Sequence, residues 1–424
     1  MNFNAAVKRI RFGFHPNFWI ANGMELFERL AYYSQAAIFS VFLRDHLHLS
    51  LADAGKLQSL FGGLIYSLPI LGGTLADKFG FRRAFSTAFG ILAAGYLLIG
   101  STGMDLFAPL YAHISIFWTL VIILIFTAFG GSFIKPSVLG TVAVASMGEN
   151  KSLGYAVYYW LVNIGAAIGP ALAYLVRNEF GIEFVYLISS VSCLLMFIVN
   201  AFFYKNIAPD SAMPVESLGT KLKNLVVVLR NTRFMVFLLI FSLFWIMFWQ
   251  EFIIVPFYVR DFISRDAPFE IIASAGAWGI IVFQLFVNRL TRNLPADRAI
   301  VAGFAVASLS WLVVALHPAI STMIATIVVF SIGEMTQAPR YYEYISNLAP
   351  PGQQGLYQGY GFLPIALAYA LGGILGTWMY DRVAVQAHSP GSIWFVLFGV
   401  GVLATVLMML YNIFSKKKAV THVY

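Results

Sequence analysis

Long apolar runs recur along the chain at intervals that suit a membrane protein. A helix needs about 20 mostly apolar residues to cross the hydrocarbon core of a bilayer. We count twelve such runs, divided by a more polar stretch, and they predict an all-α polytopic membrane protein whose twelve transmembrane helices form two six-helix bundles. The runs cover roughly residues 17–43, 53–76, 84–103, 116–144, 152–176 and 182–204, then 234–260, 270–290, 298–316, 319–347, 355–380 and 391–414.

The polar stretch predicts the domain organisation. We expect an N-terminal bundle over residues 1–204, a cytoplasmic linker over 205–232 and a C-terminal bundle over 233–424. The two halves also echo each other: Val41-Phe-Leu-Arg44-Asp45 recurs as Phe257-Tyr-Val-Arg260-Asp261, at the same end of the first and seventh predicted helices. Six helices followed by six related helices are typical of secondary transporter folds.

Composition and charge agree with a membrane location. Hydrophobic residues make up 60% of the chain and charged residues 11%, where a soluble domain has about a quarter charged residues. The net charge of +8 does not indicate nucleic acid, because the basic residues gather in loops on one side, as in cytoplasmic loops of membrane proteins. We expect both termini in the cytoplasm and the chain in a bacterial inner membrane. The cytoplasmic set includes Lys8, Arg9, Arg11, Lys78, Arg82, Arg83, Lys151, Lys205, Lys221, Lys223, Arg230, Arg233, Arg289, Arg292 and Arg298.

Three charged residues stand near the middle of the first predicted helix. Each charged side chain at the centre of a bilayer costs about 2.5–3.5 kcal/mol on insertion scales, so such residues face a bundle interior or a water-filled cavity. Glu25 precedes Arg29 by four residues, the favourable order for an ion pair on a helix, and Glu28 lies beside them. The pattern predicts a site that handles protons and substrate. The alternative is a purely structural ion pair.

Further polar and aromatic residues accompany these charges. Lys135 is a buried cation directly before Pro136, and Glu25 or Glu28 is its obvious partner, although it could serve only to neutralise that carboxylate. Tyr32, Tyr33 and Tyr66 can form rigid pocket walls or can simply pack. Asn163 can donate to and accept from a backbone amide of a solute.

The loop between the second and third helices reads Gly73-Thr-Leu-Ala-Asp77-Lys-Phe-Gly-Phe-Arg82-Arg83. We expect Gly73 to permit a close helix approach, and Asp77 to cap a helix start and hold the basic residues. The stretch resembles the loop signature of the major facilitator superfamily almost residue for residue. The resemblance implies the major facilitator fold and a cytoplasmic latch at this loop, with a degenerate copy between Arg289 and Arg298.

Several motifs resemble those of a narrower family, the proton-coupled oligopeptide transporters. The first helix matches through Glu25, Glu28, Arg29, Tyr32 and Tyr33. The other similar stretches are Tyr66-x-x-Pro69-x-x-Gly72-Gly73, Gly130-Gly131-Ser-Phe-Ile134-Lys135-Pro136, Tyr158-Tyr159-x-x-Val162-Asn163-x-Gly165 and Gly333-Glu334.

The family resemblance implies an activity and roles for residues. It implies a symporter for di- or tripeptides, or similar zwitterions, that works by alternating access. Glu25, Glu28, Arg29 and Lys135 would couple proton movement to substrate binding. Arg29 and Lys135 would face the carboxylate of the substrate, and Glu334 would hold its amino group. The expected substrate-binding residues are Arg29, Tyr32, Tyr33, Tyr66, Lys135, Asn163, Trp245 and Glu334. Arg340 and Glu343, three apart, can form a gate or scaffold pair.

The seventh helix departs from the family pattern. In the stretch Phe244-Trp245-Ile-Met-Phe-Trp249-Gln250, Trp249 stands where the family has a carboxylate. Glu251 follows two residues later, about 200° around the helix, and cannot simply substitute. An alternative therefore stays open: a transporter or exporter of another small organic solute, such as an amino-acid derivative, a siderophore-like compound or a drug.

An enzyme or a receptor is a third class, and the sequence disfavours it. We find no nucleophile with an adjacent base and no clustered metal ligands; the seven histidines are scattered, and Cys193 is the only cysteine. We therefore expect no catalytic residues, no metal and no cofactor, with protons as the coupling ion. The expected partners are a small, peptide-like solute and membrane lipids, without nucleic acid, and we expect a monomer.

Overall fold

The computed structural model describes residues 13–146, 150–205, 218–350 and 354–421. These residues are almost entirely helical, and the only strand-like contact among them is one isolated bridge between Phe14 and Ser146. Within these ranges, ten helical segments are long and apolar enough to cross a membrane, and one bent pair can form an eleventh span. Helix α2 (Pro16–Val41) is also long enough, with 26 residues, but carries three charged residues. The predicted all-α polytopic membrane protein is confirmed.

Contacts divide the chain into two units that differ from the predicted bundles in one hairpin. The first unit comprises residues 1–38 and 67–218, and the second comprises 39–66 and 219–424. The tip of the first predicted helical hairpin therefore groups with the C-terminal half. The predicted domain boundaries themselves stay predictions.

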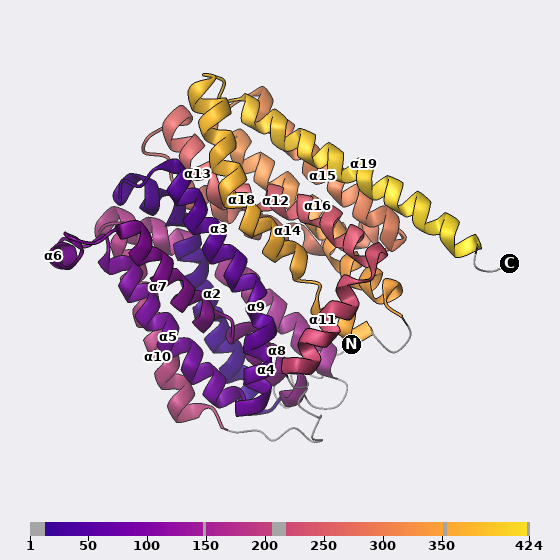
Figure 1. Cartoon of the computed structure of the whole chain (residues 1–424), viewed down its shortest axis with the longest axis horizontal. Coiled ribbons are helices and arrows are strands. Elements are labelled where there is room, and N and C mark those ends of the chain that lie inside the picture. Colours follow the sequence, from indigo (N-terminus) through magenta and orange to yellow (C-terminus); the bar gives the residue numbers. More distant parts are fainter. Residues whose placement is uncertain (1–12, 147–149, 206–217, 351–353, 422–424) are drawn as a thin grey trace. The chain divides into compact units, whose positions relative to one another are not determined.

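The first unit holds most of α2 and the elements from α4 to α10 (Figure 1). Its centre is α5, which packs against α10 and α7. Aromatic side chains of α5 fill this core: Phe85, Phe89 and Tyr96 are fully buried. The elements are α4 (Pro69–Phe79), α5 (Phe81–Ser101), η2 (Asp105–Phe107), α6 (Ala108–Tyr111), α7 (Ile116–Gly131), α8 (Ile134–Ala145), α9 (Lys151–Glu179) and α10 (Glu183–Phe203).

The second unit is built on two sets of packed helices: α15 lies against α16 and α19, and α12 lies against α18. The predicted linker contains a helix, α11 (Leu218–Leu229). The other elements are η1 (Phe42–His46), α3 (Leu51–Ser67), α12 (Thr232–Ile253), α13 (Val255–Tyr258), η4 (Val259–Ile263), α14 (Phe269–Thr291), α15 (Ala296–Leu316), α16 (Ile320–Leu348), α17 (Gln354–Gly359), α18 (Leu363–Met379), η5 (Tyr380–Gln386) and α19 (Ser392–Thr421).

Several of the predicted continuous helices are broken, and proline accounts directly for the break in the second. The second predicted helix divides into α3 and α4, whose axes differ by 41°, and α4 begins at Pro69. Proline has no N–H to donate and its ring clashes with the preceding turn. The fourth predicted helix divides at Ser132 and Phe133, just before Lys135 and Pro136. Periodicity alone does not reveal either break, because the apolar pattern runs through both.

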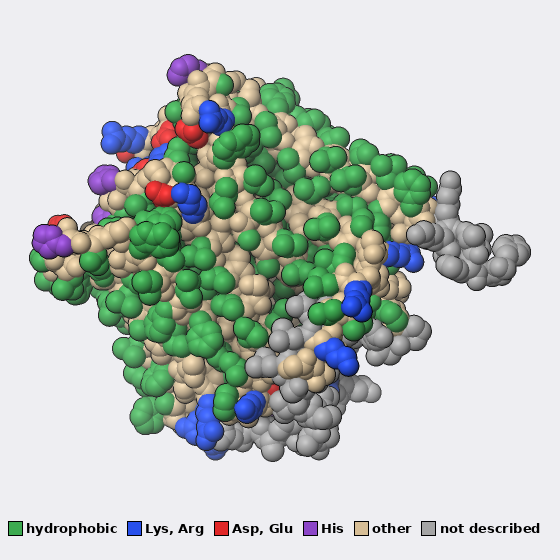
Figure 2. Space-filling model, in the orientation of Figure 1, with side chains coloured by type: hydrophobic (Ala, Val, Ile, Leu, Met, Phe, Trp, Pro, Cys, Tyr) green, Lys and Arg blue, Asp and Glu red, His purple; other side chains and the backbone are tan. Residues whose placement is uncertain are grey.

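The outer faces of the helices are apolar. On the face that Figure 2 shows, hydrophobic side chains cover most of the helix surface, and the charged side chains lie toward its margins. Large side chains such as Ile122 in α7 and Leu285 in α14 are exposed. In water such a surface would be a liability, so it indicates contact with lipid acyl chains.

Candidate functional site: buried charges in the two units

The three charged residues of α2 form a buried ion cluster. Glu25 is 0%, Glu28 is 1% and Arg29 is 5% exposed. Arg29 Nε donates to Glu28 Oε2 at 2.5 Å, Arg29 Nη2 also pairs with Glu28, and Arg29 Nε lies 3.3 Å from Glu25 Oε1. The predicted pair four residues apart is confirmed, but the shorter contacts go to Glu28. One arginine thus holds two carboxylates away from water.

Two glycines of α9 bring this helix against the cluster. A Cβ at Gly165 would lie 2.5 Å from Arg29 Cβ, and one at Gly169 would lie 2.8 Å from the carbonyl oxygen of Leu30. Ser34 Oγ donates to the carbonyl oxygen of Gly169 at 2.6 Å. Small residues four apart permit this kind of close helix packing. The packing restricts where the Arg29 side chain can go.

Lys135 reaches the same cluster from α8. It lies within electrostatic reach of Glu25, Glu28 and Arg29, and its predicted pairing with one of the two glutamates stays a prediction. The preceding helix break is braced by α4, because a Cβ at Gly72 would overlap the backbone of Ser132. A Cβ at Gly73 would lie 3.3 Å from Pro136 Cβ, which confirms the close approach expected at Gly73.

Aromatic and amide groups complete this part of the first unit. The guanidinium carbon of Arg29 lies 4.9 Å from the centre of the Tyr32 ring, a cation–π distance, and the Tyr32 and Tyr33 rings meet edge to face at 5.3 Å. The amide nitrogen of Asn163 donates to the carbonyl oxygen of Tyr159, 2.8 Å away in its own helix, which uses one of its two N–H groups. The expected contact of Asn163 with a solute stays a prediction.

The remaining predicted substrate residues, Tyr66, Trp245 and Glu334, belong to the second unit. Tyr66 lies in an aromatic cluster, with its ring centre 5.6 Å from Trp249. Trp249 stacks on Tyr369 of α18 at 3.9 Å, and Trp245 packs beside Phe248 at 5.1 Å. The prediction that these residues and the α2 cluster line one pocket stays a prediction.

Glu251 is a candidate that the sequence reasoning set aside. It is 6% exposed, and its Oε1 would lie 3.5 Å from a Cβ at Gly276 of α14. Trp249 faces α18, so the two positions point to different neighbours, as their 200° separation predicts. Glu334 lies within electrostatic reach of Glu251. Within the described ranges, neither carboxylate has an ion-pair partner. The sequence held one sign of this role: Glu251 is the carboxylate nearest to Trp249, the position where the family has a carboxylate.

The predicted gate residues occupy helix ends. Arg82 donates to the carbonyl oxygen of Ala201 at 2.5 Å, while Arg83 is exposed. Asp77 does not cap a helix start: α4 continues to Phe79, so this residue lies in the last turn of a helix instead.

The predicted pair of Arg340 with Glu343 is confirmed, with Nη1 and Oε2 at a distance of 2.8 Å. Arg340 also donates to the carbonyl oxygen of Arg292, in the degenerate second copy of the loop motif.

Comparisons with known proteins agree with this architecture. The model of the Major Facilitator Superfamily matches residues 24–264. The Multidrug resistance protein MdtH of Photorhabdus laumondii is 24% identical over 354 residues, 83% of this chain and 82% of that protein. MdtH of Escherichia coli strain K12 is 22% identical over 92% of each chain.

Solved structures share the fold at low sequence identity. A crystal structure of a POT family transporter in complex with 5-aminolevulinic acid superposes with a TM-score of 0.77 at 16% identity, over 96% of this chain and 97% of that one. A structure of the nucleoside transporter NupG has the same score at 13% identity, over 93% and 99% of the two chains. Because the family model spans more than half of the sequence, the chain belongs to the Major Facilitator Superfamily and is an integral membrane transporter.

Proposed function

We propose that the protein is a proton-coupled secondary transporter for short peptides or similar zwitterions, working by alternating access in a bacterial inner membrane. The observation that carries the proposal is the buried cluster of Glu25, Glu28 and Arg29, with Lys135 within electrostatic reach. Buried ionisable residues in a membrane protein commonly mark ion or substrate pathways. If the cluster served only for packing, apolar residues would fill the same space without the free-energy cost of removing charges from water.

The contacts suggest how a proton can act. Glu28 takes the two closest contacts of Arg29, so adding a proton to Glu28 removes the charge that holds the guanidinium. Arg29 and Lys135 would then be two cations with one remaining carboxylate, Glu25, beside them. A solute carboxylate replaces the missing negative charge. Proton and solute therefore bind together, which is symport in thermodynamic terms.

A flux assay tests this coupling. The purified protein is placed in proteoliposomes with an imposed pH gradient, acidic outside, and uptake of a labelled dipeptide is measured. We expect uptake above the concentration gradient in the parent protein. In Glu28→Gln, the side chain cannot change charge, so uptake driven by the pH gradient is lost while exchange of labelled for unlabelled dipeptide continues.

A matched control separates coupling from general damage. Glu179→Gln removes an exposed carboxylate at the end of α9 and should leave the pH response as in the parent protein. Dipeptide uptake that ignores the pH gradient in the parent protein, or a full response in Glu28→Gln, would refute the assignment.

A second candidate function is export of another small organic solute, and one observation favours it. The second unit holds Glu251 and Glu334, two carboxylates without a cationic partner in the residues the structure describes. Such a pair suits an amine-bearing solute that exchanges with protons. The names of the MdtH relatives also concern multidrug resistance.

The two functions differ in the direction in which the solute moves relative to the proton. Inverted vesicles that have generated an acidic interior report proton movement through a pH-sensitive dye. Added lipophilic amines should release protons if the chain is an exchanger, and this release should disappear in Glu334→Gln. A response to dipeptides alone, with uptake and proton entry in the same direction, supports the first function.

A further inference from the structure

The connection between α5 and α7 carries an exposed apolar stripe. It covers residues 102–115 and contains η2 and α6, and we call it the α6 loop. In Figure 1, α6 projects beyond the ends of α5 and α7, and Figure 2 shows hydrophobic side chains on this projection. Leu106, Leu110 and Ile114 follow one another at intervals of four residues and are 82%, 69% and 51% exposed. Neither the family match nor the proposed function gives this loop a role.

The stripe continues along α7 without a change of spacing. Trp118, Ile122 and Phe126 follow at the same interval of four residues, and all three are exposed. Ile122 belongs to the outer surface that indicates contact with lipid acyl chains. Trp118 lies near the start of α7, and tryptophan is enriched at the level of the lipid headgroups. The apolar stripe of the α6 loop is therefore continuous with a surface that faces lipid.

Hydrogen bonds hold the α6 loop in a defined conformation. The hydroxyl groups of Tyr111 and Ser101 lie 2.6 Å apart, which ties α6 to the end of α5. The backbone N–H of Ile114 donates to the carbonyl oxygen of Tyr111, and that of Phe107 donates to the carbonyl oxygen of Met104. Internal pairing of backbone groups is what an apolar environment requires. The exposed stripe thus belongs to a folded segment that suits a membrane boundary.

The charge of the α6 loop identifies which part of a lipid it can contact. Asp105 is the only charged residue of the loop, and the sequence has no lysine or arginine between Arg83 and Lys135. Attraction to anionic headgroups needs clustered basic residues. The loop therefore offers apolar contact without attraction to headgroup charge, and the matching partner is the region where headgroups meet acyl chains.

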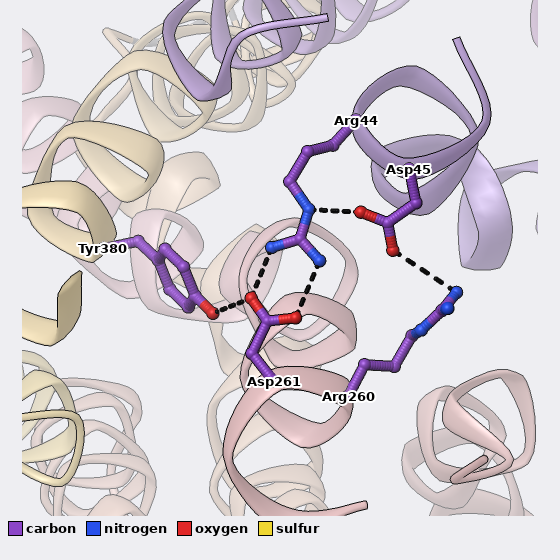
Figure 3. A network of polar contacts seen from close by, with 5 residues as sticks. All are labelled: Arg44, Asp45, Arg260, Asp261 and Tyr380. Atoms are coloured by element: carbon purple, nitrogen blue, oxygen red, sulfur yellow. Dashed lines mark hydrogen bonds and ion pairs between the residues drawn. The ribbon is translucent and has the colours of Figure 1, made fainter. Parts of the chain in front are cut away.

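Charged residues at helix ends of the second unit are arranged differently. The π-turns η1 and η4 direct Arg44 and Asp261 toward each other, with Nη2 and Oδ1 at a distance of 2.9 Å. Figure 3 shows this pair within a network of polar contacts whose other members are Asp45, Arg260 and Tyr380. The α6 loop has no basic residue with which to build such a network.

We infer that the α6 loop is an interfacial anchor, in which Leu106, Leu110 and Ile114 insert between the lipid headgroups and the acyl chains. The anchor acts on the centre of the first unit, because the loop is joined to α5 by the chain and by the contact of Tyr111 with Ser101. It fixes the depth of α5 and α7 in the bilayer. This inference concerns contact with lipid and does not depend on which solute is carried.

The depth of the stripe can be measured by fluorescence. Leu110→Cys carries an environment-sensitive dye, in a chain whose buried Cys193 is replaced by serine, and the protein is placed in phosphatidylcholine nanodiscs. Quenching is compared between iodide in water and lipids that bear a nitroxide near the headgroup or near the end of the acyl chain. We expect the nitroxide near the headgroup to quench about twofold more than the deep one, because interfacial segments lie about 5–10 Å into the boundary.

Two matched positions show whether the stripe itself is inserted. His388→Cys is the reference for water, because His388 is exposed in the connection between η5 and α19. Ala108→Cys tests the loop from inside: Ala108 is exposed and precedes Leu110 by two residues, about 200° around α6. Iodide should quench the dye at His388 most, the dye at Ala108 less and the dye at Leu110 least.

A double substitution tests whether the leucines hold the loop in place. With the dye at Ile114→Cys, the variant Leu106→Ser with Leu110→Ser should raise quenching by iodide about twofold. Both leucines are exposed, so the melting temperature in detergent should match that of the parent protein, which separates release from misfolding. Unchanged quenching in this variant would contradict the anchor.

The lipid composition and the oligomeric state decide between lipid and other partners of the stripe. Replacing phosphatidylcholine by phosphatidylglycerol should leave the quenching at Leu110 unchanged, and quenching by lipid nitroxides only in the anionic bilayer would overturn the inference. Quenching by iodide equal to that at His388 would place the stripe in water and also overturn it. Protection from iodide without quenching by either lipid, in nanodiscs that hold two copies of the chain, would assign the stripe to a contact between copies instead.

Discussion

The buried charges of the two units are balanced in different ways. In α2, one guanidinium lies between two carboxylates, and Lys135 is within electrostatic reach. In the second unit, Glu251 and Glu334 influence each other and have no ion-pair partner within the described ranges. The first set is close to neutral as it stands. The second set consists of two acidic groups, whose ionised forms low-polarity surroundings disfavour.

This difference separates two tasks that one transporter must perform. A neutral cluster is stable at rest and changes only when a proton or a solute disturbs its internal pairs. Unpaired carboxylates are costly at rest and become favourable when a proton or an amine arrives. We therefore expect variants of the two sets to change stability in opposite directions, and the following predictions run from the largest expected effect to the smallest.

Loss of Arg29 should have the largest effect. Arg29→Gln leaves Glu25 and Glu28 buried together without their shared cation, and removal of one partner from a buried ion pair typically costs about 3–5 kcal/mol. We expect a large fall in the thermal unfolding temperature in detergent and no gradient-driven transport. Arg29→Lys keeps the charge but loses the two-point contact with Glu28, so its stability should fall between those of the parent and Arg29→Gln. A melting temperature unchanged in Arg29→Gln would show that the cluster is not held as described.

Steric disturbance of the cluster should have the next largest effect. In Gly165→Ala, the new methyl group would lie 2.5 Å from Arg29 Cβ, so α9 and α2 must move apart. Overpacking of this kind costs about 1–3 kcal/mol. Gly23→Ala is the matched control on α2, because nothing lies within 4 Å of its new Cβ. There alanine should stabilise the helix by up to about 1 kcal/mol. Equal melting shifts in the two variants would contradict the close packing.

Much of this arrangement could be predicted from the sequence because burial in a membrane leaves few choices. The apolar runs located the helices, and the cost of charge in lipid marked Glu25, Glu28 and Arg29 as inward-facing. Gly165 and Gly169 stand four residues apart, a spacing that permits close helix contact, and the structure shows that contact.

Other features depend on contacts that spacing does not encode. The Asn163 amide bonds its own helix, which a residue type alone cannot reveal. Asp77 looked like a cap because the loop motif suggested an earlier helix end, but α4 continues through Phe79 to Gly80, whose φ of 85° ends it. The π-turns that bring Arg44 to Asp261 leave no periodic signal in an apolar helix end. The echo between repeats indicated related positions, and only the structure shows that these positions contact each other.

Neutralising Glu251 should change stability in the opposite direction from loss of Arg29. Glu251→Gln keeps the shape of the side chain and removes an acidic group that has no ion-pair partner in the described part of the chain. We expect a gain of up to about 1 kcal/mol, because a buried amide costs less than a buried unpaired carboxylate. Glu28→Gln, measured in the same detergent, should lower stability, since Arg29 loses its closest partner. A similar fall in both variants would mean that the two sets of carboxylates are not differently balanced.

The exposed pair of Arg340 and Glu343 gives the smallest expected effect and the reference for all the others. Their side chains are 24% and 47% exposed, and water screens most of the attraction between them. Glu343→Gln should therefore cost no more than about 0.5 kcal/mol, and raising the salt concentration should shrink even that difference. Arg340 keeps its hydrogen bond to the carbonyl oxygen of Arg292, so the two helix ends stay joined. If Glu343→Gln were as damaging as Arg29→Gln, burial could not be the reason for the importance of the α2 cluster. A small effect that disappears with salt, beside a large one in α2 that persists, would assign the difference to the membrane-buried surroundings.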